Sequence, residues 1–162
     1  MRALWTLLVA MVFLLVPVPR VQAAVVFSCT VSTAGISFGT YNPLSPTGDA
    51  STGSWVVRCT ATGSGSGTVT GTLSLSTGSS GRYATRYMVA GTNQLAYNVY
   101  LDPGYTEILG NGTGGSYAPT ESGTVTAGQV YQVNGTLYGL IPAAQNAAPG
   151  SYADTLVVTV TY

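Results

Sequence analysis

The sequence predicts an all-β domain, a Greek-key β-sandwich. Three observations support this fold class: seven or eight short stretches alternate apolar and polar residues, turn-forming residues separate them, and no amphipathic helical period follows residue 23. Short strands at this spacing are typical of two-sheet sandwiches. The expected strands and strand-like stretches cover residues 25–31, 36–41, 54–61, 68–77, 95–101, 124–133, 135–141 and 150–162.

The segment that precedes the first strand predicts export. Met1 and Arg2 are followed by an apolar run over residues 3–16, two prolines and a small-residue site that ends at Ala23. This order is typical of a secretory signal peptide. The run is about 14 residues, whereas a membrane-spanning helix needs about 20, so we expect no membrane insertion after cleavage. We predict a signal peptide over residues 1–23 and one β-sandwich domain over residues 24–162.

The chain has two cysteines, Cys29 in the first expected strand and Cys59 in the third. In an oxidising compartment, pairing them is the simplest outcome. Closing a loop of about 30 residues stabilises a fold by about 3–4 kcal/mol in the chain-entropy model. A metal site or an activated nucleophile needs further ligands or a base, and the chain has no histidine. We therefore predict a structural disulfide.

Turn-forming residues punctuate the remaining stretches. Residues 42–43 (Asn-Pro) end the second stretch, residues 63–67 form a Gly/Ser loop, and residues 102–104 (Asp-Pro-Gly) form a turn. Asn134-Gly135 predicts a tight hairpin turn between stretches 124–133 and 135–141. Asn111 and Asn134 also fit the N-glycosylation pattern, but Asn-Gly is first of all a turn dipeptide. We interpret both as turns.

Charge excludes two classes of partner. After residue 23 the chain has three arginines against five carboxylates, a net charge of −2, and no lysine or histidine. Nucleic acids and anionic membrane surfaces are bound by clustered cations, which three scattered arginines do not supply. We expect neither as a partner.

The same residues argue against catalysis. Acid–base chemistry at neutral pH uses a tuned histidine, a tuned lysine or a carboxylate pair. Asp49, Asp102 and Glu121 lie beside turn residues, so we interpret them as solvated loop caps. Serine is abundant without a base to activate it, and no phosphate-binding glycine motif opens a helix. We predict a protein that is not an enzyme and has no cofactor or metal.

Residues 150–162 predict a strand at the end of the chain. Tyr152, Leu156, Val158, Val160 and Tyr162 share one face, and threonines occupy the other. Such a strand at a sheet edge exposes backbone donors and acceptors that another chain can complete. The alternation alone shows a half-buried strand and nothing about its neighbours, and at this point it favours an ordinary closing strand of a complete sandwich.

Five segments in order, after Cys29, together resemble the spore coat protein U domain family. They are residues 35–41 (GISFGTY), 83–88 (YATRYM), 95–102 (LAYNVYLD), 138–142 (YGLIP) and 150–160 (GSYADTLVVTV). The resemblance covers nearly all of residues 24–162. The family includes the pilins of archaic, Csu-type chaperone–usher pili.

The resemblance implies an incomplete Ig-like sandwich that lacks one strand, and a disulfide between Cys29 and Cys59. A periplasmic chaperone fills the groove first, an outer-membrane usher exchanges it, and the N-terminal donor strand of a neighbouring pilin takes its place. Tyr152, Leu156, Val158, Val160 and Tyr162 are then the strand-pairing residues of the groove. The resemblance places the protein in the periplasm in transit, then in a pilus at the cell surface or in an extracellular coat.

Two departures from the family pattern narrow these expectations. Many members carry Trp-Gly-Asp-Gly where this chain has Leu-Gly-Asn-Gly at residues 109–112, so a role tied to that tryptophan does not transfer. A donor strand needs about 10 extended residues, whereas only residues 24–28 lie between the expected cleavage site and Cys29. We therefore expect an acceptor-type subunit at a fibre end, either a tip or a minor component.

Two other functions stay open at this point. The family name suggests a spore or cell-surface coat role. Eleven tyrosines provide stacking surfaces for a secreted glycan-binding or adhesive module, although Tyr97 and Tyr152 alternate with core positions and are expected to be packed. A tip subunit of a pilus could also serve in adhesion.

Overall fold

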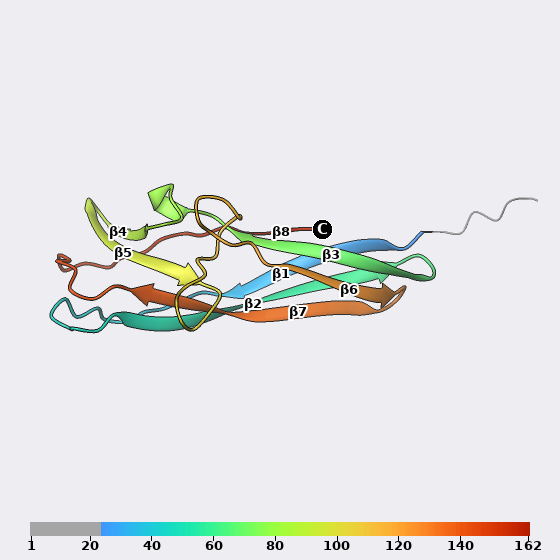
Figure 1. Cartoon of the computed structure of the whole chain (residues 1–162), viewed down its shortest axis with the longest axis horizontal. Coiled ribbons are helices and arrows are strands. Elements are labelled where there is room, and N and C mark those ends of the chain that lie inside the picture. The colour runs from blue at the N-terminus through green and yellow to red at the C-terminus, as the bar shows by residue number, and fades with distance from the viewer. Residues whose placement is uncertain (1–23) are drawn as a thin grey trace, which may run out of the picture.

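The computed structural model describes residues 24–162, so the signal peptide predicted for residues 1–23 lies outside the described residues. Two sheets form a β-sandwich whose long strands follow the long axis of the molecule (Figure 1). The larger sheet has the order β1-β2-β7-β5-β4 and the smaller one β6-β3-β8. The strands are β1 (Val26–Ala34), β2 (Asp49–Thr62), β3 (Ser66–Leu75), β4 (Arg86–Ala90), β5 (Asn93–Tyr100), β6 (Thr120–Thr126), β7 (Val130–Ile141) and β8 (Val158–Thr161). All pairings between these strands are antiparallel, and the predicted all-β sandwich is confirmed.

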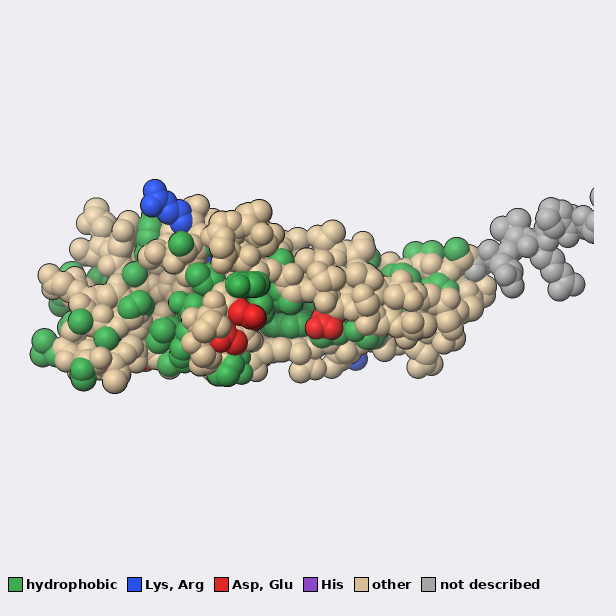
Figure 2. All heavy atoms as spheres, in the orientation of Figure 1, with side chains coloured by type: hydrophobic (Ala, Val, Ile, Leu, Met, Phe, Trp, Pro, Cys, Tyr) green, Lys and Arg blue, Asp and Glu red, His purple; other side chains and the backbone are tan. Residues whose placement is uncertain are grey.

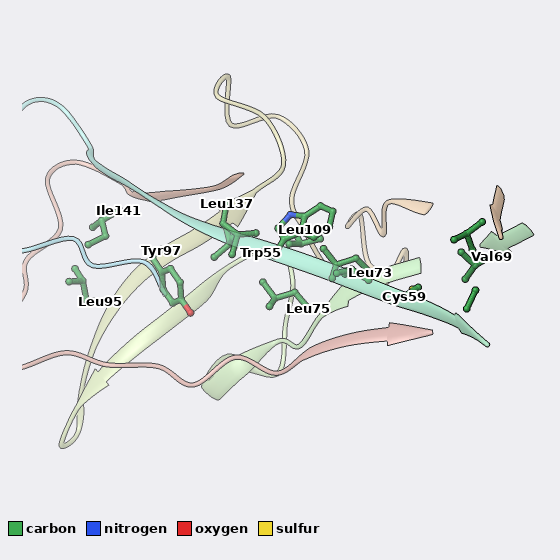
Figure 3. Close-up of a cluster of buried hydrophobic side chains, with 14 residues drawn as sticks. Trp55, Cys59, Val69, Leu73, Leu75, Leu95, Tyr97, Leu109, Leu137 and Ile141 are labelled. Carbon is green, nitrogen blue, oxygen red and sulfur yellow. The ribbon is translucent and has the colours of Figure 1, made fainter. Parts of the chain in front are cut away.

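Alternating apolar residues give each sheet one buried face. In β2, Trp55, Val57, Cys59 and Ala61 are buried and the residues between them are more exposed, as expected where successive side chains point to opposite faces. Figure 3 shows these side chains meeting those of the other strands in one elongated core. Burying each large aliphatic side chain stabilises the fold by about 1.5–3 kcal/mol.

The outward face of β3 and β6 consists of paired hydroxyl groups. Four Ser/Thr pairs lie opposite one another at hydrogen-bond distance: Ser66–Thr126 at 2.9 Å, Thr68–Thr124 at 3.2 Å, Thr70–Ser122 at 2.9 Å and Thr72–Thr120 at 2.8 Å. Cross-strand hydroxyl pairs contribute about 0.2–1 kcal/mol each. The Ser/Thr-rich sequence here therefore forms the solvent side of a regular strand pair.

The hairpin turn predicted at Asn134-Gly135 is wrong. Both residues lie inside β7, and Gly135 pairs with Trp55 of β2. A Cβ at Gly135 would lie 2.7 Å from atoms of the Trp55 indole, so the glycine makes room for the ring. The turn between β6 and β7 falls earlier, at Gly128, which has a φ of 83°. Packing against tryptophan has overridden a local turn preference at residue 134.

Three further strand predictions need correction. Residues 36–41 form no strand, although Ile36 and Phe38 pack against the core, because no neighbouring strand pairs with them. β4 was not expected, since only five residues form it before the turn at Gly91, where φ is 63°. Of the strand expected over residues 150–162, only β8 is in a ladder.

Candidate functional site

An open edge of each sheet borders one side of the sandwich. β1 ends the order of the larger sheet and β8 ends that of the smaller one. The two strands approach each other in space, yet no pairing joins them among the described residues. An edge strand carries backbone donors and acceptors that a further strand can use.

The chain before β8 directs alternate backbone groups toward this open side. The Val157 carbonyl accepts a hydrogen bond from the Ser76 amide at 2.9 Å, and the Val157 amide donates to Ser76 Oγ at 2.9 Å. Ala153 likewise exchanges both backbone bonds with Val89 of β4. Because neighbouring residues of an extended chain point in opposite directions, the N–H and C=O groups of Leu156 and Val158 face the other way, toward the gap.

A groove of about 430 Å³ lies between these edges. Its walls combine the end of β1 and residues 35–38 on one side with residues 152–158 on the other. Its apolar lining includes Ile36, Phe38, Leu75, Met88, Val99, Leu137, Tyr152, Leu156 and Val158. A second hollow of about 600 Å³ shares Ile36, Phe38, Met88 and Tyr152 with the first. The two hollows adjoin at these four residues, and we refer to them together as the apolar channel.

The floor of the groove contains one carboxylate held by fixed donors. Asp154 Oδ1 accepts hydrogen bonds from the Ser79 amide at 2.9 Å and the Ser79 hydroxyl at 2.7 Å, and Asp154 Oδ2 accepts from the Tyr97 hydroxyl at 2.7 Å. Figure 3 shows the Tyr97 hydroxyl pointing out of the apolar cluster toward the C-terminal ribbon. Burial, together with the bond to Asp154, raises the pKa of Tyr97 above its ordinary value.

A fully buried arginine lies beneath this floor. The Arg86 guanidinium donates to the Ser76 carbonyl at 2.8 and 3.1 Å, to the Leu109 carbonyl at 2.8 Å and to Asn98 Oδ1 at 2.6 Å. It also lies over the Tyr83 ring, 5.3 Å from its centroid. Burial lowers the pKa of Arg86, and Tyr97 and Asp154 oppose that shift.

Sequence reasoning missed this arginine as a structural element. Arg86 lies in the segment 83–88 that carries part of the family resemblance, but it was counted only as one of three scattered cations. The sequence feature that could have indicated a buried arginine is its position at the start of β4, whose other residues are mostly apolar. Asn98, which receives its shortest hydrogen bond, lies in the segment 95–102 of the same resemblance.

The structure joins Cys29 and Cys59 in a disulfide, as predicted. The two cysteines are directly opposite in the β1–β2 pairing, with Cα atoms 4.0 Å apart. The cross-link therefore fastens the edge strand β1 to β2, which pairs with β7 at the centre of the larger sheet.

The residues predicted to pair with a strand fall in three places. Tyr152, Leu156 and Val158 line the groove. Val160 packs against the core and lines a different hollow, together with Trp55. Tyr162 lies beyond the last paired residue of β8, is 56% exposed and does not line the groove.

Only one of the three carboxylates predicted as loop caps has that role. Asp102 caps its loop, since its carboxylate accepts the Thr106 amide at 2.9 Å and the Glu107 amide at 2.7 Å. These bonds, that from Glu107 first, lower the pKa of Asp102. Asp49 and Glu121 lie inside β2 and β6 instead, because those strands extend further than their turn-flanked sequences suggested.

Other chemistry-bearing groups are sparse. In the part of the chain that the structure describes, no three His, Cys, Asp or Glu side chains come together as metal ligands would. The face in Figure 2 has no patch of cationic side chains. Across residues 24–162, no helix has the length and apolarity to cross a membrane.

Tyrosines expected to be packed are indeed withdrawn from the surface. Tyr97 is 6% exposed and Tyr152 is half-buried at the groove.

Asn111 lies in a turn as predicted, where its Oδ1 accepts the Thr113 amide at 3.0 Å and Gly112 has a φ of 83°.

These features define a class of protein: a disulfide-linked β-sandwich with an apolar groove between two unpaired strand edges. The chain belongs to the Spore Coat Protein U domain family, whose sequence model matches residues 17–159. It is similar to Protein U of Myxococcus xanthus, with 31% identity over an alignment of 134 residues; the match covers 78% of this chain and 71% of that protein.

A solved structure with a similar fold comes from the CsuC–CsuE chaperone–tip adhesion subunit pre-assembly complex of the archaic chaperone–usher Csu pili of Acinetobacter baumannii. The match has a TM-score of 0.54 and 20% sequence identity, and covers 85% of this chain. It spans 40% of the solved chain. At this identity the likeness concerns the fold.

Proposed function

We propose that this protein is a structural subunit of a chaperone–usher type pilus or surface fibre. It accepts an extended strand from another subunit into the groove between residues 33–38 and residues 152–158, and acts through backbone pairing rather than catalysis. The single observation that carries the proposal is the apolar groove bounded by two unpaired strand edges.

An extended segment fits this groove physically. Along residues 152–158 the wall is about 20 Å long, at about 3.3 Å per residue, so about seven donor residues lie beside it. The donor's backbone would bond to the open side of Leu156 and Val158, and its alternate side chains would enter the apolar channel. Strand addition of this kind takes its affinity from main-chain bonds and its specificity from side-chain pockets.

The partners follow from this mode of assembly. A periplasmic chaperone would cover the groove after export, an outer-membrane usher would receive the complex, and a neighbouring subunit would supply the donor strand. The solved complex with a similar fold pairs a chaperone with a pilus subunit, which supports this route. The protein would then leave the periplasm for the cell surface.

An acceptor position at the tip, or as a minor subunit, is part of the proposal. Val25 and Phe27 pack against this chain's own core, so a donor segment cannot be drawn from residue 25 onward. If cleavage follows residue 23, only residue 24 precedes this packed segment, which is too short for a donor strand. The mass of the exported protein tests this point, because retention of ten or more residues before Val25 would make the chain a donor as well.

The central test is thermal unfolding of the exported protein with and without a synthetic donor-strand peptide from a Csu-type rod subunit. Peptide at 100 times its Kd adds about 2.7 kcal/mol, which corresponds to a rise in Tm of about 8 °C for a domain of this size. If the protein unfolds cooperatively as a monomer and its Tm does not change with peptide, the proposal is refuted and a coat or glycan-binding role is favoured.

A pair of adjacent substitutions links this effect to the groove. Leu156 lines the groove, whereas Val157 is 59% exposed on the opposite side of the same extended segment. Leu156→Arg should abolish the peptide-dependent rise in Tm, and Val157→Arg should leave it unchanged. Circular dichroism of both variants without peptide checks that each retains its strands. If both variants lose the peptide-dependent rise in Tm equally, the peptide does not bind in the groove.

A further inference from the structure

Asp154 is the one charged residue among those that line the groove and its adjoining hollow. It occupies a half-buried position between Tyr152 and Leu156, so its side chain shares the inward face with two apolar groove residues. A strand that covers the groove places one of its inward side chains beside this carboxylate. A buried polar group without a partner is costly, so the neighbour of Asp154 matters to binding.

The hydrogen bonds of Asp154 leave one acceptor position open. Oδ1 is saturated by the Ser79 amide, the Ser79 hydroxyl and the Thr155 amide, each within 2.7–2.9 Å. Oδ2 accepts only the Tyr97 hydroxyl, and a carboxylate oxygen has two lone pairs. Among the described residues, no second donor bonds to Oδ2.

The charge of Asp154 already has an opposite charge nearby. The Arg86 guanidinium is fully buried, and its attraction to Asp154 opposes the lowering of the Arg86 pKa by burial. A cation on the incoming strand would add a buried charge with no counterpart, which is expensive to desolvate. A neutral hydrogen-bond donor would complete the carboxylate without that cost.

We propose that the inserted strand carries a neutral hydrogen-bond donor, a Ser or Thr hydroxyl or an Asn amide, at the one inward position beside Asp154, between apolar inward residues. This inference rests on the proposed function and deepens it by naming a specificity determinant of the groove. The polar position fixes register: a slip of two residues brings an apolar side chain to the carboxylate, and a slip of one turns every side chain to the wrong face.

The test uses designed peptides on the unmodified protein. Each peptide has valine at all four inward positions, beside Tyr152, Asp154, Leu156 and Val158, and the same polar residues at the outward ones. In a series, a single threonine, which matches valine in shape, replaces each valine in turn. The peptide with threonine beside Asp154 should bind about tenfold tighter than the all-valine peptide, since a hydrogen bond to a charged group contributes about that factor.

Threonine at each of the other three positions should weaken binding, and glutamate beside Asp154 should abolish it. The tight-binding position is the third inward residue of the peptide if it runs antiparallel to residues 152–158 and the second if it runs parallel. The scan therefore also reports strand direction. Equal affinity of all four threonine peptides, or a preference at an end position, overturns this inference while the strand-accepting function stands.

A variant locates the preference. Asp154→Ala should bind the all-valine and threonine peptides equally, which removes the tenfold difference in a double-mutant cycle. Tyr97→Phe retains the carboxylate and removes the one protein donor to Oδ2, so both lone pairs of that oxygen are open and the preference for threonine should persist. This variant tests the assignment if the Asp154→Ala variant fails to fold. Loss of the preference in Tyr97→Phe overturns the assignment to Asp154. If no peptide of the series binds the unmodified protein, the proposed function itself fails.

Discussion

Replacing Arg86 with methionine should destabilise the domain strongly. Methionine keeps much of the aliphatic stem and removes the guanidinium. The Ser76 and Leu109 carbonyls then lose their donor, and Asn98 Oδ1 keeps only the Val99 amide. Each buried acceptor left unsatisfied costs about 1–3 kcal/mol. Recovering the desolvation cost of the buried charge offsets part of this sum. We expect a net loss of about 3 kcal/mol.

For a domain of this size, that loss corresponds to a fall in Tm of about 10 °C. The assay is thermal unfolding followed by far-ultraviolet circular dichroism, with the disulfide intact. Arg82→Met is the matched control, because Arg82 is exposed and its side chain makes no hydrogen bond among those of the described residues. The control should change stability by no more than about 0.5 kcal/mol. A fall of less than about 3 °C in the Arg86 variant would refute the argument that its bonds hold β4 to the core.

Three other outcomes follow from local geometry. Replacing both Cys29 and Cys59 with alanine should cost about 3–4 kcal/mol in chemical denaturation, because the 30-residue separation no longer restricts the unfolded chain; an unchanged midpoint would contradict this. Gly135→Ala should cost about 1–3 kcal/mol through overpacking, whereas Gly71→Ala, whose Cβ would meet Val160 at an ordinary 3.7 Å, should cost little. The lowered pKa of Asp102 means that its carboxylate stabilises the loop at pH values above the ordinary aspartate pKa, and that this stabilisation is lost as pH falls through the folded value. The loop amides should then have lower protection factors at acid pH, relative to intrinsic exchange, and this pH dependence should be absent in Asp102→Asn.

The sequence predicted the long, alternating strands of the sandwich better than its turns and its short strand. Alternation in a long strand such as β2 is a strong signal, because every second residue meets the core. The turn at Asn134 failed, since a dipeptide preference does not register that Gly135 faces an indole ring across the sheet. β4 was missed because five residues are too few to establish a period.

The sequence predicted only one wall of the candidate site, because alternation reports burial within one strand and not contacts between distant segments. Leu156 and Val158 were identified from alternation, which reports side-chain burial. The opposite wall at residues 35–38 and the paired Tyr97 and Asp154 come from segments far apart in the chain. No local pattern specifies that they meet, so only the folded structure brings the apolar channel and its single carboxylate together.

The alternation of residues 152–160 has a consequence beyond the fold. Even-numbered positions in this segment are half-buried and odd-numbered ones exposed throughout, yet only β8 is in a ladder. Side-chain burial and the backbone bonds of Ala153 and Val157 therefore hold residues 152–157 extended, while the backbone groups on the other side of the segment remain available to a partner. Because apolar side chains already order this wall, an incoming strand would order only itself, which lowers the entropic cost of binding. Under the proposed function, the same pattern that contributes to the core would also prepare the edge for a second chain.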